Sequence, residues 1–71
     1  MTTFNDPLKR FGDRVRELRR ARNISQESLA HEAGIDRGNL GNIERGVVNI
    51  TLRRLYKIAE ALGVEPHELL K

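Results

Sequence analysis

Apolar residues recur at helical spacing near the start of the chain. They follow one another at intervals of three, four and three residues, at Leu8, Phe11, Val15 and Leu18. This spacing places them on one face of a helix. Asp6 and Pro7 form a typical start, an N-cap followed by proline at the first helical position. The pattern predicts a helix over residues 7–22. Gly12 lies inside it at a cost of about 1 kcal/mol relative to alanine, and close packing is one reason to keep a glycine there.

Four further helix starts share one pattern, in which an apolar residue precedes the N-cap and a leucine follows the cap four positions later. The pairs are Ile24/Leu29, Ile35/Leu40, Ile50/Leu55 and Val64/Leu69, around the caps Ser25, Asp36, Thr51 and Glu65. Such a hydrophobic staple fixes the angle at which the chain enters a helix. Glycines at 34, 46 and 63 stand where helix C-termini need a left-handed residue. We therefore expect helices over 26–33, 37–45, 52–62 and 66–70, which makes the fold all-α, a five-helix bundle in a single domain, 1–71.

The second and third predicted helices are joined only by Gly34, Ile35 and Asp36. So short a connection makes the two helices cross steeply, and a steep crossing needs small residues where they touch. Ala30 and Ala33 supply them. This is the helix-turn-helix arrangement, in which the helix over 37–45 lies in the major groove of DNA.

Three segments carry a family resemblance: residues 12–30, 33–46 and 55–64. They resemble the helix-turn-helix family of phage repressors and Cro proteins, and the likeness extends over residues 8–70. Asp36-Arg37, the run Ile43 to Gly46, and the run Asn49 to Leu52 are most similar to the controller proteins of restriction–modification systems. Those proteins often carry an aromatic residue where Asn39 stands. The resemblance implies a lambda-repressor-like DNA-binding domain that acts as a transcriptional regulator.

One side of the third predicted helix is expected to face DNA. Leu40 and Ile43 point inward, and the opposite side consists of Arg37, Gly38, Gly41, Asn42 and Arg45. Arg37 has the geometry to bond guanine O6 and N7 together, and Asn42 to bond adenine N6 and N7. Two glycines on one helix face favour close approach of its backbone to another molecule.

Further DNA contacts come from helix geometry and from the resemblance. We expect base reading by Arg37, Gly38, Asn39 and Asn42, although Asn39 equally suits a phosphate contact or an ordinary surface position. Gln26 opens its helix, where free N–H groups attract phosphate. The resemblance implies phosphate contacts by Gln26, Arg45 and Asn49. The alternative for Arg37 and Asn42 is that both are ordinary polar surface residues.

Two charged residues are assigned to structure. The resemblance implies a partly buried ion pair between Arg19 and Glu44, which would hold the third helix in orientation. The other bases of the first helix are Lys9, Arg10, Arg14, Arg16, Arg20 and Arg22, and most have an acid three or four residues away. We interpret them as a solvated face.

Composition narrows the classes of function. The chain has 71 residues, a net charge of +3 and no cysteine, which favours an anionic partner. His31 and His67 lack metal-ligand spacing, and nothing resembles a nucleophile with its base. We expect no enzyme activity, no metal and no cofactor. No apolar run is long enough to cross a membrane, so a cytoplasmic location is expected.

The partner is expected to be double-stranded DNA, bound as a homodimer. A helix of about nine residues spans roughly 13 Å, too little to select a site in a genome, so two copies on a palindromic operator are expected. The predicted interface runs from Val47 and Val48 through the last two helices to Val64, Leu69 and Leu70, unless these residues only close the core. The competing function is a protein-interaction module, such as an antitoxin or adaptor. An apolar patch in place of the DNA face would favour it.

Overall fold

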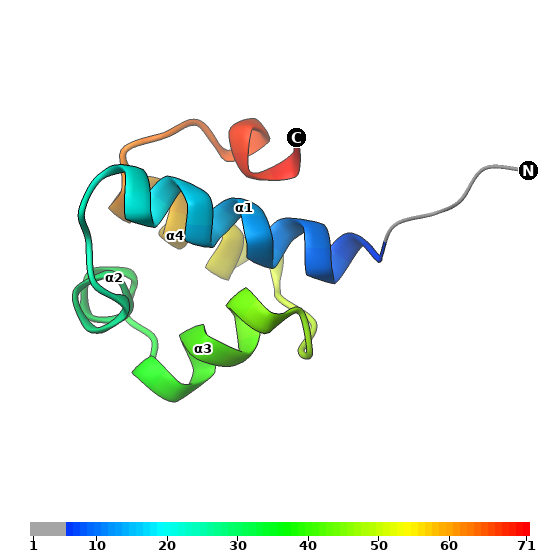
Figure 1. Ribbon diagram of the computed structural model, residues 1–71, viewed down its shortest axis with the longest axis horizontal. Helices are drawn as coiled ribbons and strands as arrows, with labels where there is room; N and C mark the ends of the chain where they lie inside the picture. The colour runs from blue at the N-terminus through cyan, green and yellow to red at the C-terminus, as the bar shows by residue number, and fades with distance from the viewer. Residues whose placement is uncertain (1–5) are drawn as a thin grey trace, which may run out of the picture.

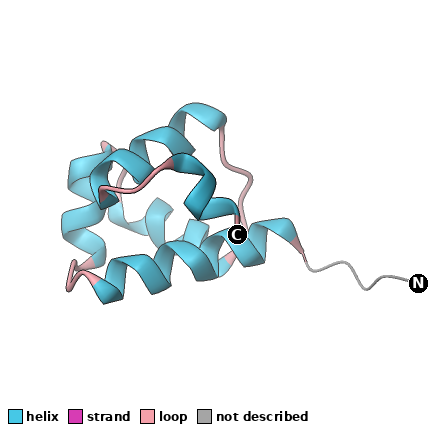
Figure 2. Cartoon of the chain, turned by 90° about the horizontal axis from the view of Figure 1, so that it is seen from above, coloured by secondary structure: helices cyan, strands magenta, loops and turns pink. Residues whose placement is uncertain are grey.

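The computed structural model describes residues 6–71, so residues 1–5 of the expected 1–71 domain lie outside the described residues. The elements are α1 (Pro7–Ala21), α2 (Gln26–Ala33), α3 (Arg37–Arg45), α4 (Leu52–Leu62) and the 3-10 helix η1 (Pro66–Leu70). Figure 1 shows α1 between α3 and η1, with α4 behind it. Within residues 6–71 there are only helices and loops (Figure 2). The all-α class is therefore confirmed.

The expected count of five α-helices is wrong, because the last element is a 3-10 helix. Pro66 has no N–H to donate, and the Glu68 N–H bonds the Glu65 carbonyl at 2.9 Å, an i to i+3 bond. Five residues make fewer than two turns, and such short segments commonly take this tighter form. The first helix also ends one residue earlier than predicted, at Ala21.

Polar caps begin the helices at the positions that the sequence indicates. The side chains of Ser25, Asp36 and Thr51 each accept a bond from a backbone N–H in the first turn that follows. Gly34, Gly46 and Gly63 end α2, α3 and α4 with φ between 72° and 75°. These caps satisfy backbone groups that a helix leaves unpaired at its ends.

The apolar pairs predicted around the caps do pack together in one core. Leu29, Ile35, Leu40, Leu55 and Leu69 are buried, and Ile24, Ile50 and Val64 are partly buried against them. Phe11, Val15 and Leu18 of α1 complete this core. Helix α1 packs on α3 and η1, while α2 packs on α3 and α4. Only the inward side of α3 therefore takes part in the core.

Gly12 marks the closest approach of α1 to α3. A Cβ atom built on Gly12 would lie 2.4 Å from the Ile43 carbonyl oxygen and 2.5 Å from that of Glu44. Because both are backbone atoms, no side-chain movement relieves the overlap. Close packing is therefore the reason for this glycine, and it sets the distance between α1 and the C-terminal turn of α3.

Candidate nucleic-acid interface

Helices α2 and α3 form the steep crossing that the short connection predicts. In Figure 1, α2 is seen almost end-on and α3 from the side. Ala30 and Ala33 are each 2% exposed at the buried side of α2. Gly34 takes a left-handed conformation, and Asp36 then caps α3 through the N–H groups of Gly38 and Asn39. The turn thus sets the direction in which α3 leaves α2.

The outward side of α3 carries most of the residues expected to read DNA. Arg37, Gly38 and Arg45 are exposed, and Asn39 and Asn42 are partly exposed. Arg45 Nη2 donates to Asn42 Oδ1. Reading adenine uses both the oxygen and the nitrogen of an asparagine amide. An amide oxygen has two lone pairs, so Asn42 Oδ1 can accept from a base while it also accepts from Arg45.

Gly41 differs from the expectation of a bare glycine on the outward side. It is buried, yet a Cβ atom there would meet only Arg45 Nη1, at 3.5 Å. The Arg45 side chain, lying four residues along the same helix face, covers it. The backbone at Gly41 becomes accessible to a partner only when Arg45 moves.

Gln26 is half-buried at the start of α2, and its Nε2 donates to Glu44 Oε1 at 2.9 Å. A side-chain amide has two N–H donors, so the second remains for another acceptor. Gln26 and Arg37 also line one shallow hollow, together with Arg19, Arg20, Ser25 and Glu27. The structure therefore brings an expected phosphate contact and an expected base contact to the same place, between the starts of α2 and α3.

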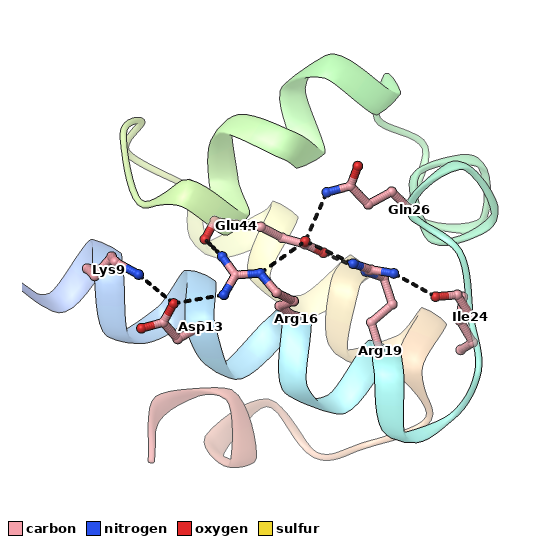
Figure 3. Close-up of polar contacts among 7 residues, drawn as sticks. All are labelled: Lys9, Asp13, Arg16, Arg19, Ile24, Gln26 and Glu44. Carbon is pink, nitrogen blue, oxygen red and sulfur yellow. Dashed lines mark hydrogen bonds and ion pairs between the residues drawn. The ribbon is translucent and has the colours of Figure 1, made fainter.

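Glu44 is the buried centre of a polar network (Figure 3). Its side chain is 2% exposed and that of Arg19 is 10% exposed. Arg19 donates from Nε to Glu44 Oε2 at 2.8 Å and from Nη2 to Oε1 at 3.2 Å. Arg19 Nη1 also donates to the Ile24 carbonyl at 2.9 Å. The structure thus brings together the two residues assigned to a structural pair, and adds Gln26 to them.

The segment after α3 is exposed at Val47 and Asn49. Asn49 makes no side-chain hydrogen bond within residues 6–71, so its amide is open to solvent. Val48 is partly buried against the core instead of forming a surface patch. Val47 is therefore the exposed apolar residue that follows the face of α3 expected to meet DNA.

The bases of α1 do more than the solvated face that the sequence indicated. The expected pairs Lys9–Asp13, Arg14–Glu17 and Arg16–Asp13 are present. However, three arginines also donate to backbone carbonyls of distant elements. These bonds run from Arg10 to Lys71, from Arg14 to Glu68 and from Arg16 to Glu44. Arg14 and Arg16 are partly buried, and their guanidinium groups bond α1 to η1 and α3, so the interpretation as a solvated face is wrong for these two. Arg10 is exposed, as that interpretation expects.

Asp13 lies in the middle of the ion pairs on α1. The hydrogen bond from Lys9 holds the pKa of its carboxyl below the ordinary value, and Arg16 acts in the same direction. The carboxylate is thus favoured in its charged form beside Arg16.

Exposed apolar side chains lie on α4 as well as after α3. Leu52 is 69% exposed and Tyr56 is 55% exposed. Both line a groove with Arg53, Lys57, Ala59, Glu60, Val64, Glu65 and Pro66. The predicted interface includes α4 together with Val64, Leu69 and Leu70. Leu69 is buried in the core and Val64 is partly buried against it, whereas Leu70 is 64% exposed. Leu52 and Tyr56 lie one turn apart on the outward side of α4. This spacing could have indicated from the sequence that they form an exposed apolar patch.

Two further properties concern the part of the chain that the structure describes. No group of three or more metal-ligating side chains occurs in residues 6–71. No helix in this part is long and apolar enough to cross a membrane.

Comparison with known proteins agrees with this geometry. A family model described as helix-turn-helix matches residues 15–69. Control protein C.BamHI of Bacillus amyloliquefaciens is 46% identical over 61 residues, which are 84% of this chain and 75% of that protein. The restriction–modification controller protein C.AhdI from Aeromonas hydrophila superposes with a TM-score of 0.86 at 50% identity, over 87% of this chain and 94% of that chain. The biofilm master regulator SinR, crystallised in complex with DNA, superposes with a TM-score of 0.81 at 32% identity, over 86% of this chain and 98% of that chain. The resemblance to controller proteins is confirmed.

Proposed function

We propose that this chain, which belongs to the helix-turn-helix family, is a sequence-specific DNA-binding transcriptional regulator that reads the major groove with α3. The observation that carries the proposal is the division of α3 into two sides. Leu40, Ile43 and Glu44 are buried, while Arg37, Gly38 and Arg45 are exposed. A helix held firmly on one side and polar on the other suits insertion into a groove.

Roles follow from the chemistry of the outward residues. Arg37 at the first turn of α3 suits guanine, and Asn42 about one turn later suits adenine. Gln26 donates its second N–H to a phosphate while Glu44 holds the first. Arg45 and Asn49 contact neighbouring phosphates. A related regulator crystallised in complex with DNA shares this fold, which supports the proposal.

We further propose that the protein binds a palindromic operator as a homodimer through the groove of α4. This groove exposes Leu52 and Tyr56 between charges of both signs, with Arg53 and Lys57 against Glu60 and Glu65. A two-fold axis brings the same patch of two copies together, so bases of one copy can face acids of the other. The expected location of such a DNA regulator is the cytoplasm, and the proposed role involves no catalysis and no cofactor.

Selection from a random DNA library tests the function directly. We expect a palindromic site with half-site centres about one helical turn, 34–36 Å, apart. With about 6–10 phosphate contacts in the dimer, affinity should fall about 10³- to 10⁵-fold between 50 and 200 mM salt. Affinity that stays constant over this range would reject DNA as the partner. It would favour the protein-interaction role, in which Leu52 and Tyr56 bind another protein.

A further inference from the structure

Arg16 makes contacts that neither the family resemblance nor the proposed DNA contacts explain. Its Nη2 donates to the Glu44 carbonyl at 2.8 Å, and its Nη1 donates to Asp13 Oδ1 at 3.1 Å. Its Nε also lies 3.8 Å from Glu44 Oε1. Figure 3 shows the guanidinium group of Arg16 between Asp13 and Glu44. One side chain of α1 thus contacts both the backbone and the side chain of a residue in the last turn of α3.

The carbonyl that Arg16 binds is one that a helix end normally leaves unpaired. The carbonyls of Asn42 and Ile43 accept from the N–H of Gly46, and that of Asn42 also accepts from Val47. The Glu44 carbonyl instead receives its bond from Arg16, which belongs to a different helix. Arginine near a helix C-terminus also interacts favourably with the helix dipole.

Helix α1 makes a second contact with the C-terminal turn of α3. Gly12 lies one turn before Arg16 on α1, and its missing side chain allows α1 to reach the carbonyls of Ile43 and Glu44. Gly12 therefore fixes how close the two helices lie, and Arg16 supplies a directional bond across that contact. Asp13 orients Arg16 and is itself held by Lys9 at 2.7 Å.

The turn held in this way carries two of the residues proposed to contact DNA, Asn42 and Arg45. We propose that Arg16 is a positioning residue for DNA recognition, because it fixes the C-terminal turn of α3 through the Glu44 carbonyl. This inference rests on the proposed function. Arg16 acts through α3 and does not itself contact DNA.

Arg14 offers a closely matched control. It also lies on α1, also donates to a carbonyl of a distant element (Glu68, at 2.8 Å) and also pairs with an acid of its own helix. The side chains of Arg14 and Arg16 are 25% and 28% exposed. Arg14→Gln and Arg16→Gln therefore remove the same charge, the same kind of bond and similar packing. They differ in the element that is released, η1 for the first and α3 for the second, and Arg16→Gln also removes a counter-charge 3.8 Å from Glu44 Oε1.

The experiment compares both variants in the full chain by amide hydrogen exchange and by binding to the selected DNA site. We expect similar melting temperatures, with faster exchange at Gly46 and Val47 only in Arg16→Gln. Its affinity should fall about tenfold further than that of Arg14→Gln, because DNA binding must then order the released turn of α3, at a cost comparable to one hydrogen bond to a charged group. Base preference should weaken at the pairs nearest the C-terminal end of α3. Arg16→Lys, which keeps the charge and a single donor nitrogen, should recover most of the loss.

Several results would overturn the inference. Equal exchange and equal binding in the two glutamine variants would make Arg16 an ordinary surface arginine. A loss of affinity that is equal for all DNA sequences, with the slope of affinity against salt reduced by about one contact, would make Arg16 a direct phosphate ligand.

If the wild-type protein selects no DNA, the proposed function fails, while hydrogen exchange still tests whether Arg16 fixes the C-terminal turn of α3. If Arg16→Gln does not fold, Arg16→Met and Arg14→Met, which keep an apolar stem of similar length without the guanidinium group, make the same comparison.

Discussion

Glu44→Ala should be among the most damaging single changes to the stability of this domain. The carboxylate accepts two bonds from Arg19 and one from Gln26, and its side chain is 2% exposed. Alanine would leave the Arg19 guanidinium beside the core with only the Ile24 carbonyl as partner. Removing one member of a buried ion pair costs about 3–5 kcal/mol. A chain of this length has a total stability of roughly 4–11 kcal/mol, so the loss would consume much of it.

The measurement is a double-mutant cycle followed by thermal and urea unfolding. For a domain of this size each kcal/mol lowers the melting temperature by about 4–8 °C, so Glu44→Ala should lower it by at least about 12 °C. Arg19→Ala should cost less, since Arg16 Nε lies 3.8 Å from the Glu44 carboxylate and remains as a counter-charge. The double variant should be more stable than the sum of the two losses predicts.

The exposed pair Lys9–Asp13 provides a control cycle. Its side chains are 55% and 49% exposed, and such a pair on a helix surface couples by only about 0.3–0.5 kcal/mol. The reasoning about Glu44 is refuted if its cycle with Arg19 is additive to within about 0.5 kcal/mol, or if its coupling is no larger than that of the control.

Five further substitutions test the fold and the proposed interface. Gly12→Ala should destabilise the protein by about 1–3 kcal/mol despite the better helix propensity of alanine, because its Cβ overlaps two carbonyl oxygens of α3; an unchanged urea midpoint would contradict this. Gly41→Ala should raise stability by up to about 1 kcal/mol, since its Cβ meets only Arg45 Nη1 at 3.5 Å, yet weaken binding to the selected site; equal or tighter binding would argue against close approach of α3 to DNA. Arg37→Ala should cost about 1–3 kcal/mol at one base pair per half-site, whereas Gln26→Ala should weaken all sequences alike; binding profiles showing the reverse would exchange the two roles. Tyr56→Glu should leave the melting temperature of the monomer nearly unchanged and reduce occupancy to one half-site, and a protected full palindrome would place the dimer interface elsewhere.

Local signals in the sequence were sufficient to locate the helices. The side chains of Ser25, Asp36 and Thr51 accept from backbone N–H groups only two or three residues further along the chain. Gly34 ends α2 through its own left-handed backbone conformation. Such interactions are visible in a short stretch of sequence. The 3-10 type of η1 was missed because so short a helix shows the same capping residues in the sequence whether it is an α-helix or a 3-10 helix.

Contacts between distant residues could not be predicted in the same way. Arg14 and Arg16 each have an acid three residues away, which fully accounts for them as surface charges. Their bonds to the carbonyls of Glu68 and Glu44 span 54 and 28 positions, and a carbonyl carries no residue-specific signal. The exposure of Tyr56 likewise depends on which side of α4 the other helices leave uncovered.

The division of α3 into two sides separates the choice of operator from the ability to fold. The side chains that hold the helix in place, Leu40, Ile43 and Glu44, are buried, while Arg37 and Asn42 on the other side lie outside the core. Asp36 caps the helix through backbone N–H groups, which any residue supplies. New outward side chains can therefore be exchanged onto the same scaffold at little cost in stability.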